Sequence, residues 1–472
     1  MTLLQDLAVG FMSGKLLLRL DAVNQTLACH TAEHFPFLNQ PANTRNRTIF
    51  YATLGRLLFM DDDAEKFRAF MAPLGALCDG LDATANDSVL RFKSDACKHA
   101  LIGLFRDLRG LTSAANSRRT YGLVFDWFYP SRAPLLQKTM SAFADDPSVT
   151  TPLLKFVAEF CLNKTQRLTF EPSSVNGILL FREVSKLVVT YGSRSFNDPA
   201  TATTSGGNGA EPSGSRAYAE RHKGVWLATC ALTRALSGNY VNFGVFELYG
   251  DAALKDALSV AINMNLRIPL DEILTYRKVS KAYFAFLETL CHNHLPVVAA
   301  ADDATFAHVV RSLEAGLRSL DVSISSQCAA AIDVLAANTF KAAHPESPIG
   351  SGNSGGSSGL NLPPGAEALA SRVAAHPGLF PDVLRTLFDI VLFEDCANQW
   401  SLSRPMLSLI LVNEAVYNAL KAQITAAVPP AKRHGMDACF EKLMHEVTRS
   451  LASRNRDRFT QNLTVFRHEA KS

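Results

Sequence analysis

The side chains that could do chemistry gather in one short segment, "FEDCANQWSLSRP", which runs from Phe393 to Pro405. It contains the carboxylates of Glu394 and Asp395, the thiol of Cys396 and the guanidinium of Arg404. A catalytic thiol needs a neighbouring cation, a histidine or a helix N-terminus to lower its pKa. Cys396 instead follows two carboxylates at the predicted C-terminal end of a helix, where the charges and the helix dipole disfavour the thiolate. We therefore predict a turn between two helices here and not an active site.

The other residues of this segment suit a turn. Asn398 is expected to close the first helix. Ser403 is expected to cap the second helix, with Pro405 in its first turn, where the missing N–H costs little. Trp400 is predicted to be a buried hydrophobic plug, and Arg404 to pair with one of the two preceding carboxylates. Trp400 and Arg404 are also candidate partner-binding residues.

Two further motifs match known sites by residue type. In "HTAEH", His30 and His34 have the spacing of zinc ligands on one helix face, with Glu33 as a base. However, "FPFLNQP" follows at once and ends the helix, so two helix-terminal histidines are the better interpretation. A metalloenzyme that uses both histidines is a third hypothesis, after the two protein-binding functions named at the end of this section. "GSGNSGG" (residues 350–356) fits GxGxxG and GxSxG, but a Gly/Ser tract lacks the strand and helix that either motif needs.

The nine cysteines are widely spaced and contain no CxxC pair. This pattern favours reduced, mostly buried thiols over a zinc site or a disulfide framework. No Ser/His/Asp, Cys/His or phosphate-loop arrangement occurs in a suitable context. We predict no catalytic residue, no metal site and no cofactor.

An acidic run, "MDDDAEKF", places Asp61, Asp62 and Asp63 directly before a predicted helix. Acidic residues at this position stabilise the N-terminal end of the helix dipole. The alternative is an acidic patch for a basic partner protein. On that alternative, these three residues join the candidate partner-binding set.

Helical periodicity covers nearly the whole chain. "PDVLRTLFDIVLFE" places apolar residues at i, i+1, i+4, i+5 and i+8, and "MLSLILVNEAVYNALKAQI" continues with the same kind of stripe. Short signals such as "DDPSVTTP" separate the helices, and strand-like alternation is scarce. About 20 helices are expected, so that helix pairs recur at roughly 40 to 47 residues, the spacing of HEAT or armadillo repeats.

The predicted fold class is therefore all-α: a right-handed α-solenoid of about 10 HEAT-like helical hairpins, in which stacking completes each core. We expect one repeat array over residues 1–472, and an irregular all-α bundle is the alternative. Residues 197–215 and 342–365 are rich in Gly, Ser and Pro. They are predicted to be disordered loops that project from the array.

Composition limits the possible functions. The 472 residues are 47% hydrophobic and 19% charged, with a net charge of only +3, so no global field marks a nucleic-acid binder. No apolar run approaches the roughly 18 residues of a membrane span. From the residues alone, we predict a non-enzymatic α-solenoid that binds other proteins, without nucleic acid and without membrane insertion.

A family resemblance adds to this reading. "FEDCANQWSLSRPMLSLILVNE" resembles a block of the exportin-7 family, in the importin-β (karyopherin) superfamily. Other blocks agree in the same order: "LRLDAVNQ" (18–25), "GLFRDLRG" (103–110), "NGILLFREVSK" (176–186), "LSGNYVNFGVFELYGD" (236–251) and "NRDRFTQNLTVFRHE" (455–469). The chain resembles only the C-terminal half of the family, so we expect a fragment that lacks the N-terminal region with the main Ran contact.

The resemblance implies a stack of HEAT repeats that works as a nuclear transport receptor. Such receptors bind cargo with Ran-GTP in the nucleus, pass the nuclear pore on Phe-Gly nucleoporins, and release cargo in the cytoplasm. For this family the implied cargo is folded protein with basic patches, and Ran-GTP binding is expected of the full-length form. The chain would then shuttle between nucleus and cytoplasm. The alternative function is a generic α-solenoid interaction scaffold without transport activity.

Overall fold

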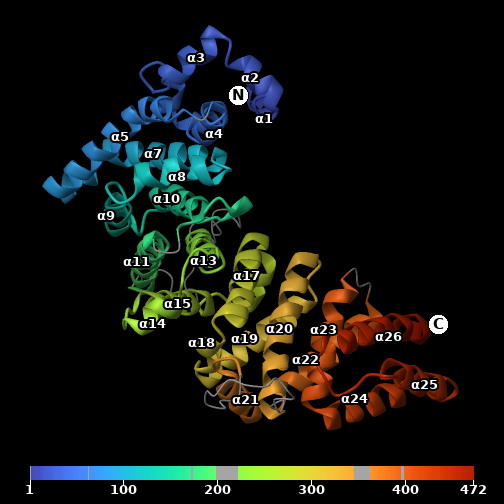
Figure 1. Cartoon of the computed structure of the whole chain (residues 1–472). Coiled ribbons are helices and arrows are strands. Elements are labelled where there is room, and N and C mark those ends of the chain that lie inside the picture. Colours follow the sequence, from blue (N-terminus) through green and yellow to red (C-terminus); the bar gives the residue numbers. More distant parts are fainter. Residues whose placement is uncertain are drawn as a thin grey trace, which may run out of the picture. The chain divides into compact units, whose positions relative to one another are not determined.

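A computed structural model describes residues 2–61, 63–171, 174–197, 222–344, 362–394 and 398–471. Throughout these residues the regular elements are helices, and no strand occurs, which confirms the predicted all-α fold class (Figure 1). The chain divides into two compact units, Met1–Ile268 and Pro269–Ser472, each of which is described by itself. Most of the two predicted loops, residues 198–215 and 345–361, lies outside the described residues.

The first unit contains α-helices and short 3-10 helices (η) in chain order. They are α1 (Thr2–Val9), α2 (Phe11–Leu17), α3 (Asp21–Ala28), η1 (Pro36–Asn39), η2 (Pro41–Asn43), α4 (Asn46–Leu58), α5 (Ala64–Asp87), α6 (Val89–Phe92), α7 (Asp95–Ala114), α8 (Arg118–Phe128), α9 (Pro134–Phe143), α10 (Pro147–Phe160), η3 (Lys164–Gln166), α11 (Asn176–Asn197), α13 (Lys223–Leu236), α14 (Gly244–Leu248) and α15 (Ala253–Leu266).

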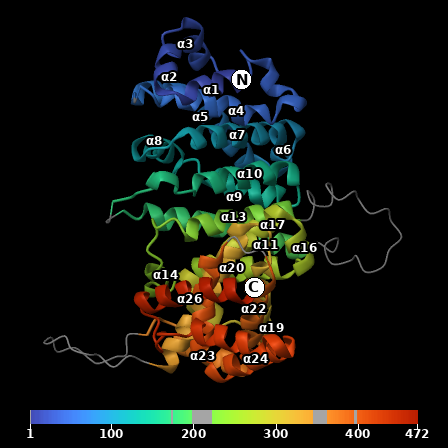
Figure 2. The same cartoon turned by 90° about the vertical axis from the view of Figure 1, so that its right-hand side faces the viewer.

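The long helices of this unit form two rows. In one row α4 packs on α7, α7 on α10, and α10 on α13; in the other, α5 contacts α9, α9 contacts α11, and α11 packs on α15 (Figure 2). Contacts of α5 with α7 and of α11 with α13 join the rows. Successive helices of the first row begin at Asn46, Asp95 and Pro147, intervals of 49 and 52 residues. The intervals exceed the predicted 40 to 47 residues because the short helices α6 and α8 are inserted between row members.

Capping residues at several helix starts follow from the sequence. Asp63 begins α5 by accepting hydrogen bonds from the backbone N–H groups of Glu65 and Lys66. Asp146 accepts a hydrogen bond from the Ser148 N–H at the start of α10, with Pro147 in the first turn. A side-chain acceptor satisfies a backbone N–H that has no partner within the helix. These are the signals from which the sequence predicts helix boundaries.

The second unit is built in the same way. Its helices are α16 (Leu270–Thr275), α17 (Arg277–Asn293), α18 (Leu295–Ala299), α19 (Asp303–Leu317), α20 (Val322–Ala343), α21 (Ala366–Ala375), α22 (Leu379–Phe393), α23 (Gln399–Val412), α24 (Glu414–Ala427), η5 (Pro430–Lys432), α25 (Arg433–Leu443) and α26 (Ser453–Lys471). One row runs α17, α20, α23, α26, and another runs α19, α22, α24. Each unit is therefore a stack of helical hairpins, as the α-solenoid prediction requires.

The contact between α4 and α7 is unusually close and holds a buried charge pair. A side chain at Gly110 would place its Cβ 2.4 Å from the carbonyl oxygen of Thr48, so only glycine fits. One turn earlier on α7, Asp107 is fully buried, and Arg47 donates from Nε to its Oδ1 at 2.8 Å and from Nη2 to its Oδ2. Burial raises the pKa of Asp107 to about 6, while Arg47 opposes this shift. The pair fixes the register of the two helices.

Replacing Arg47 with Met should destabilise the fold strongly, because Asp107 would remain buried without its cation. We expect a loss of about 3–5 kcal/mol in the free energy of unfolding. Asp107→Asn should cost less, since its amide oxygen can still accept from Arg47. Denaturant unfolding of both variants, followed by circular dichroism, measures the difference. Equal losses in the two variants would contradict the interpretation.

The stability of the Arg47→Met variant should depend on pH in a distinctive way. Without Arg47 the folded-state pKa of Asp107 should rise above about 6, whereas the unfolded value stays near the ordinary ~4. Between these values the native state binds more protons, so the free energy of unfolding falls as pH rises. The deficit of Arg47→Met relative to wild type should therefore be larger at pH 8 than at pH 5. A deficit independent of pH would contradict a buried carboxylate as its cause.

Candidate functional site

The predicted acidic patch lies at the turn between α4 and α5. The carboxylate of Asp63 is used as the N-cap of α5, and Asp61 accepts a hydrogen bond from Nζ of Lys66 at 2.8 Å. Asp62 lies outside the described residues. Asp61 and Asp63 thus have local structural partners, and their contact with a basic partner protein stays a prediction.

The segment from Phe393 to Pro405 joins two helices and includes the first two turns of the second. The helix α22 ends at Phe393 and α23 begins at Gln399, with residues 395–397, including Asp395 and Cys396, outside the described part. Glu394 forms an ion pair with Arg318, and its backbone carbonyl accepts from Arg467 at 3.1 Å. The residues between the two helices are therefore fixed by contacts with the end of α19 and with α26. Those that the structure describes form no catalytic arrangement.

Several details predicted for this turn are wrong. Asn398 does not close α22 but occupies the N-cap position of α23, and its Nδ2 donates to Oγ of Ser325 at 3.0 Å. Ser403 is not a cap: it lies in the second turn of α23, where its Oγ donates to the carbonyl oxygen of Trp400 at 2.9 Å. Pro405 stands inside the helix. The helix begins several residues earlier than predicted because Asn398 takes the place that the sequence suggested for Ser403.

This earlier start also changes the two predicted partner-binding residues. Trp400 is 73% exposed and is not a buried plug, because Leu402 and Met406 take the buried face of α23. Arg404 is also exposed, and the Glu394 carboxylate is paired with Arg318 instead. Both side chains are open to solvent, so partner binding by Trp400 and Arg404 remains a prediction.

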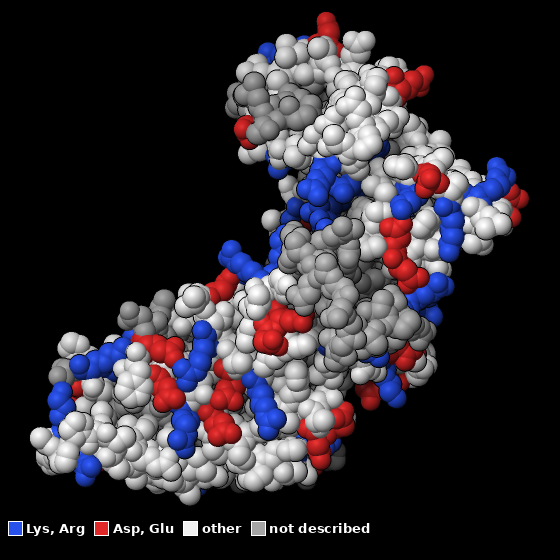
Figure 3. All heavy atoms as spheres, turned by 180° about the vertical axis from the view of Figure 1, so that it is seen from behind, with Lys and Arg blue, Asp and Glu red and all other residues white. Residues whose placement is uncertain are grey.

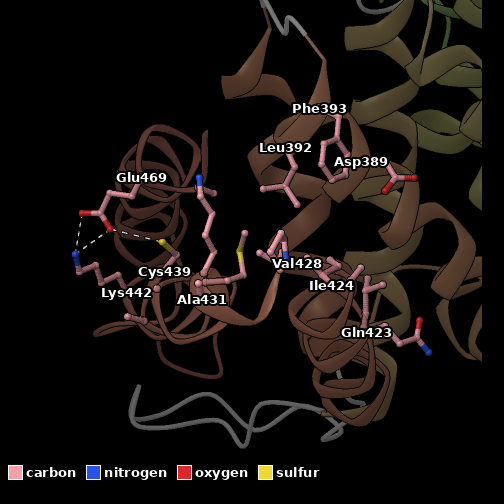
Figure 4. A pocket seen from close by; sticks show the side chains of 18 of the residues that line it. Asp389, Leu392, Phe393, Gln423, Ile424, Val428, Ala431, Cys439, Lys442 and Glu469 are labelled. Carbon is pink, nitrogen blue, oxygen red and sulfur yellow. Dashed lines mark hydrogen bonds and ion pairs between the residues drawn. The ribbon is translucent and has the colours of Figure 1, made fainter. Parts of the chain in front are cut away.

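A groove in the second unit is a stronger candidate site. Helix α24 forms one wall with Leu420, Ile424 and Val428, and Met436 and Cys439 of α25 lie on the opposite wall. Figure 4 shows the apolar side chains of Leu392, Phe393, Ile424 and Val428 along one side of the groove. The groove has a volume of about 940 Å³. Phe393, at the end of α22, is 76% exposed there.

The rim of this groove is charged and polar. Lys442 donates from Nζ to both carboxylate oxygens of Glu469 at 2.8 Å, which raises the pKa of Lys442 and lowers that of Glu469. Cys439 lies beside this pair, and burial together with the Glu469 charge raises the pKa of its thiol (Figure 4). The thiol is therefore a poor nucleophile. An apolar trough with a polar rim suits binding of an apolar side chain and not catalysis.

Other residues that could do chemistry have structural partners. His30 is buried, with its Nδ1 3.1 Å from the Tyr51 hydroxyl and its Nε2 donating to the carbonyl oxygen of Phe70 at 2.8 Å. Both ring nitrogens are thus occupied by protein. Burial raises the pKa of the Cys78 and Cys161 thiols to about 12, so they are protonated near pH 7, as the sequence predicts for buried thiols.

Among the described residues, no group of three or more His, Cys, Asp or Glu side chains is placed to hold a metal ion. The described helices include none with the length and apolar character needed to cross a bilayer.

Comparison with known proteins identifies the class of this repeat fold. Residues 1–46 match a family model described as "Exportin-7-like, TPR domain". The chain is 40% identical to exportin-7-B of Xenopus laevis and 38% identical to Ran-binding protein 17 of Homo sapiens, in each case over 99% of its length. It is 32% identical to exportin-7 of Dictyostelium discoideum over 98% of its length.

These relatives are named as exportins and Ran-binding proteins, that is, as transport and interaction proteins. The chain is similar to exportin-7 proteins over the part of them that it spans, which confirms the resemblance. It covers about two fifths of the length of these relatives, 42% of the two vertebrate proteins and 43% of the amoebal one.

Removing the cap at Asp63 should loosen the start of α5. Asp63→Ala leaves the N–H groups of Glu65 and Lys66 without their acceptor, and we expect a loss of about 1 kcal/mol in local stability. Hydrogen exchange of the first turn of α5 should therefore accelerate about fivefold. Asp63→Ser, which retains an acceptor, is the matched control and should exchange much like wild type. Equal exchange in the Ala and Ser variants would exclude a capping role.

Proposed function

We propose that the chain is part of a nuclear transport receptor that binds folded cargo proteins on a helical-repeat surface. The observation that carries the proposal is the match to exportin-7 proteins along 99% of the chain. The stacked hairpins support it, because such arrays present extended surfaces to other proteins. On this proposal the protein exports cargo from the nucleus with Ran-GTP, and shuttles between nucleus and cytoplasm through nuclear pores.

The proposed cargo carries basic patches on its folded surface. Support comes from acidic side chains at α5: Asp61 and Asp63 precede it, and Asp79 on it is 67% exposed although it is paired with Arg132 at 3.6 Å. Opposite charges across an interface steer association and set its orientation. Ran-GTP is proposed as a partner of the full-length receptor, because one relative is named a Ran-binding protein.

The groove between α24 and α25 is the proposed contact for Phe-Gly nucleoporins. Its walls offer Leu420, Ile424 and Met436 to an inserted aromatic ring. Burial of a phenylalanine side chain contributes about 1.5–3 kcal/mol, which suits weak and reversible contacts. The charged side chains of Lys442 and Glu469 at the rim would lie beside the polar backbone of the nucleoporin on either side of the inserted ring.

A scaffold without transport activity is the second candidate function. The observation that favours it is that the chain spans 42% of its relatives' length. The two functions differ in nuclear accumulation and in binding of Phe-Gly nucleoporins, neither of which a plain scaffold requires.

The transport proposal predicts that the full-length protein binds cargo better with Ran-GTP. A pull-down of basic folded cargo proteins, performed with Ran-GTP and with Ran-GDP, measures this dependence. We expect at least tenfold more cargo with Ran-GTP, since cargo and Ran-GTP stabilise the same receptor conformation. If cargo is captured equally in both nucleotide states, the export function is excluded.

Substitutions in the groove should weaken Phe-Gly binding selectively. Ile424→Asp and Met436→Asp each place a carboxylate in the apolar trough from opposite walls, and we expect about tenfold weaker binding of a Phe-Gly repeat peptide. Fluorescence anisotropy with a labelled peptide measures the affinity.

The matched control for these variants is Ala422→Asp. Ala422 lies on the same helix as Ile424 but is exposed and does not line the groove. This variant should bind the Phe-Gly peptide like wild type. If it loses as much affinity as Ile424→Asp does, or if neither does, the groove is not the nucleoporin contact.

A further inference from the structure

The first unit carries a group of arginines that have no carboxylate partner. Lys and Arg side chains gather in the upper part of Figure 3, which Figure 1 shows to be formed by this unit. We name the arginine ridge after five of its residues: Arg45, before α4; Arg56, in the last turn of α4; Arg106 and Arg109, on α7; and Arg234, on α13. Within the described part of the chain, none of the five is within ion-pair distance of a carboxylate.

The arginines of the ridge are close enough to act on one another. Burial lowers the pKa of Arg106, and the charges of Arg45 and Arg109 lower it further. Burial also lowers the pKa of Arg109, with Arg234 adding to the effect. Burial lowers the pKa of the neighbouring Lys164, and the charges of Arg167 and Arg56 add to this effect. The ridge is therefore a group of cations drawn from α4, α7 and α13, in which Arg45, Arg106, Arg109 and Arg234 repel their neighbours.

The nearby carboxylates are already used by other cations. Asp107 accepts both hydrogen bonds from Arg47 and is fully buried. Glu159 forms ion pairs with Lys164 at 3.3 Å and with Arg167 at 3.2 Å. Among the described residues, Asp107 and Glu159 thus act on Arg106 and Arg109 only through space, and neither forms an ion pair with the ridge.

The ridge also contains donors without acceptors. The Nη1 of Arg56 and the Nε of Arg106 are buried atoms that find no hydrogen-bond partner in the described structure. A buried donor without an acceptor costs about 1–3 kcal/mol. Unpaired donors and repelling cations in one patch are typical of a surface that is completed by a bound anionic partner.

We propose that the arginine ridge binds an acidic, extended polypeptide segment. Neighbouring helices in a stack lie about 8–10 Å apart, and an extended chain advances about 3.3 Å per residue. Carboxylates spaced along such a segment would therefore meet arginines on α4, α7 and α13. The planar guanidinium pairs with carboxylates through two parallel hydrogen bonds, which supplies specificity as well as charge.

The chemistry of the ridge favours a polypeptide over a nucleic acid. A single-stranded nucleic acid is held by aromatic side chains on which its bases stack. The ridge is made of arginines alone and offers no such stacking surface itself, and the chain as a whole carries a net charge of only +3. The inference does not rest on the transport function, and the acidic segment is distinct from the basic cargo proposed above.

Binding of a fluorescein-labelled peptide of 12 glutamates to the purified chain tests the proposal. Fluorescence anisotropy at physiological salt should give saturable binding for wild type. The double variant Arg106→Gln/Arg109→Gln should bind at least tenfold more weakly. The matched control, Arg68→Gln/Arg91→Gln, removes the same charge from side chains that are 69% and 73% exposed and paired with Glu65 and Asp87. It should bind like wild type.

A single variant at Arg45 and a titration with a nucleic acid complete the test. Arg45 is exposed and precedes α4, so Arg45→Gln should leave the fold intact and still weaken binding if the double variant fails to fold. A 12-residue oligouridylate is titrated in parallel. Equal affinity of wild type and ridge variants, an equal loss in the control variant, or tighter ridge-dependent binding of the oligouridylate would each overturn the proposal.

Discussion

The stacking of α7 on α10 depends on one buried arginine. Arg167 is 1% exposed, and its guanidinium donates to the carbonyl oxygens of Thr112 and Ala115 at 2.8 and 2.9 Å, at the end of α7. It also donates to the carbonyl oxygen and the carboxylate of Glu159 on α10, and to the carbonyl of Leu162. The last carbonyls of a helix have no partner within it. A single side chain satisfies the ends of two helices and sets their separation.

This buried arginine also determines the charge of the surface beside it. Because Arg167 and Lys164 occupy the carboxylate of Glu159, Arg109 stays without an ion pair although Glu159 is near enough to influence its pKa. The segment "GLFRDLRG" shows the same division of roles along one helix. Asp107 and Gly110 contact α4, whereas Arg106 and Arg109, three residues apart, are only partly buried. The packing contact and the unpaired cations thus lie side by side on α7.

Local signals made the fold predictable, and tertiary contacts account for the rest. Apolar spacing and caps such as Asp63 were enough to predict an all-α stack. The start of α23 could not be predicted, because Asn398 stands at its N-cap without a side-chain capping hydrogen bond and instead donates to Ser325, over 70 residues away. The earlier start of α23 also places Trp400 on the exposed side of the helix. The stripe through "MLSLILVNEAVYNALKAQI" divides at Asn413, whose side chain caps α24.

The two candidate surfaces were beyond sequence analysis for a related reason. The arginine ridge draws residues from positions 45 to 234, and the groove combines residues 385 to 470, so neither has a local motif. A net charge of +3 conceals the ridge, because Asp and Glu elsewhere cancel it in the sum. Charge acts over roughly a Debye length of 8 Å at physiological salt, so only the arrangement of side chains decides the local field. The ridge is therefore strongly positive to a partner in contact with it, whereas the chain is nearly neutral to a partner at a distance.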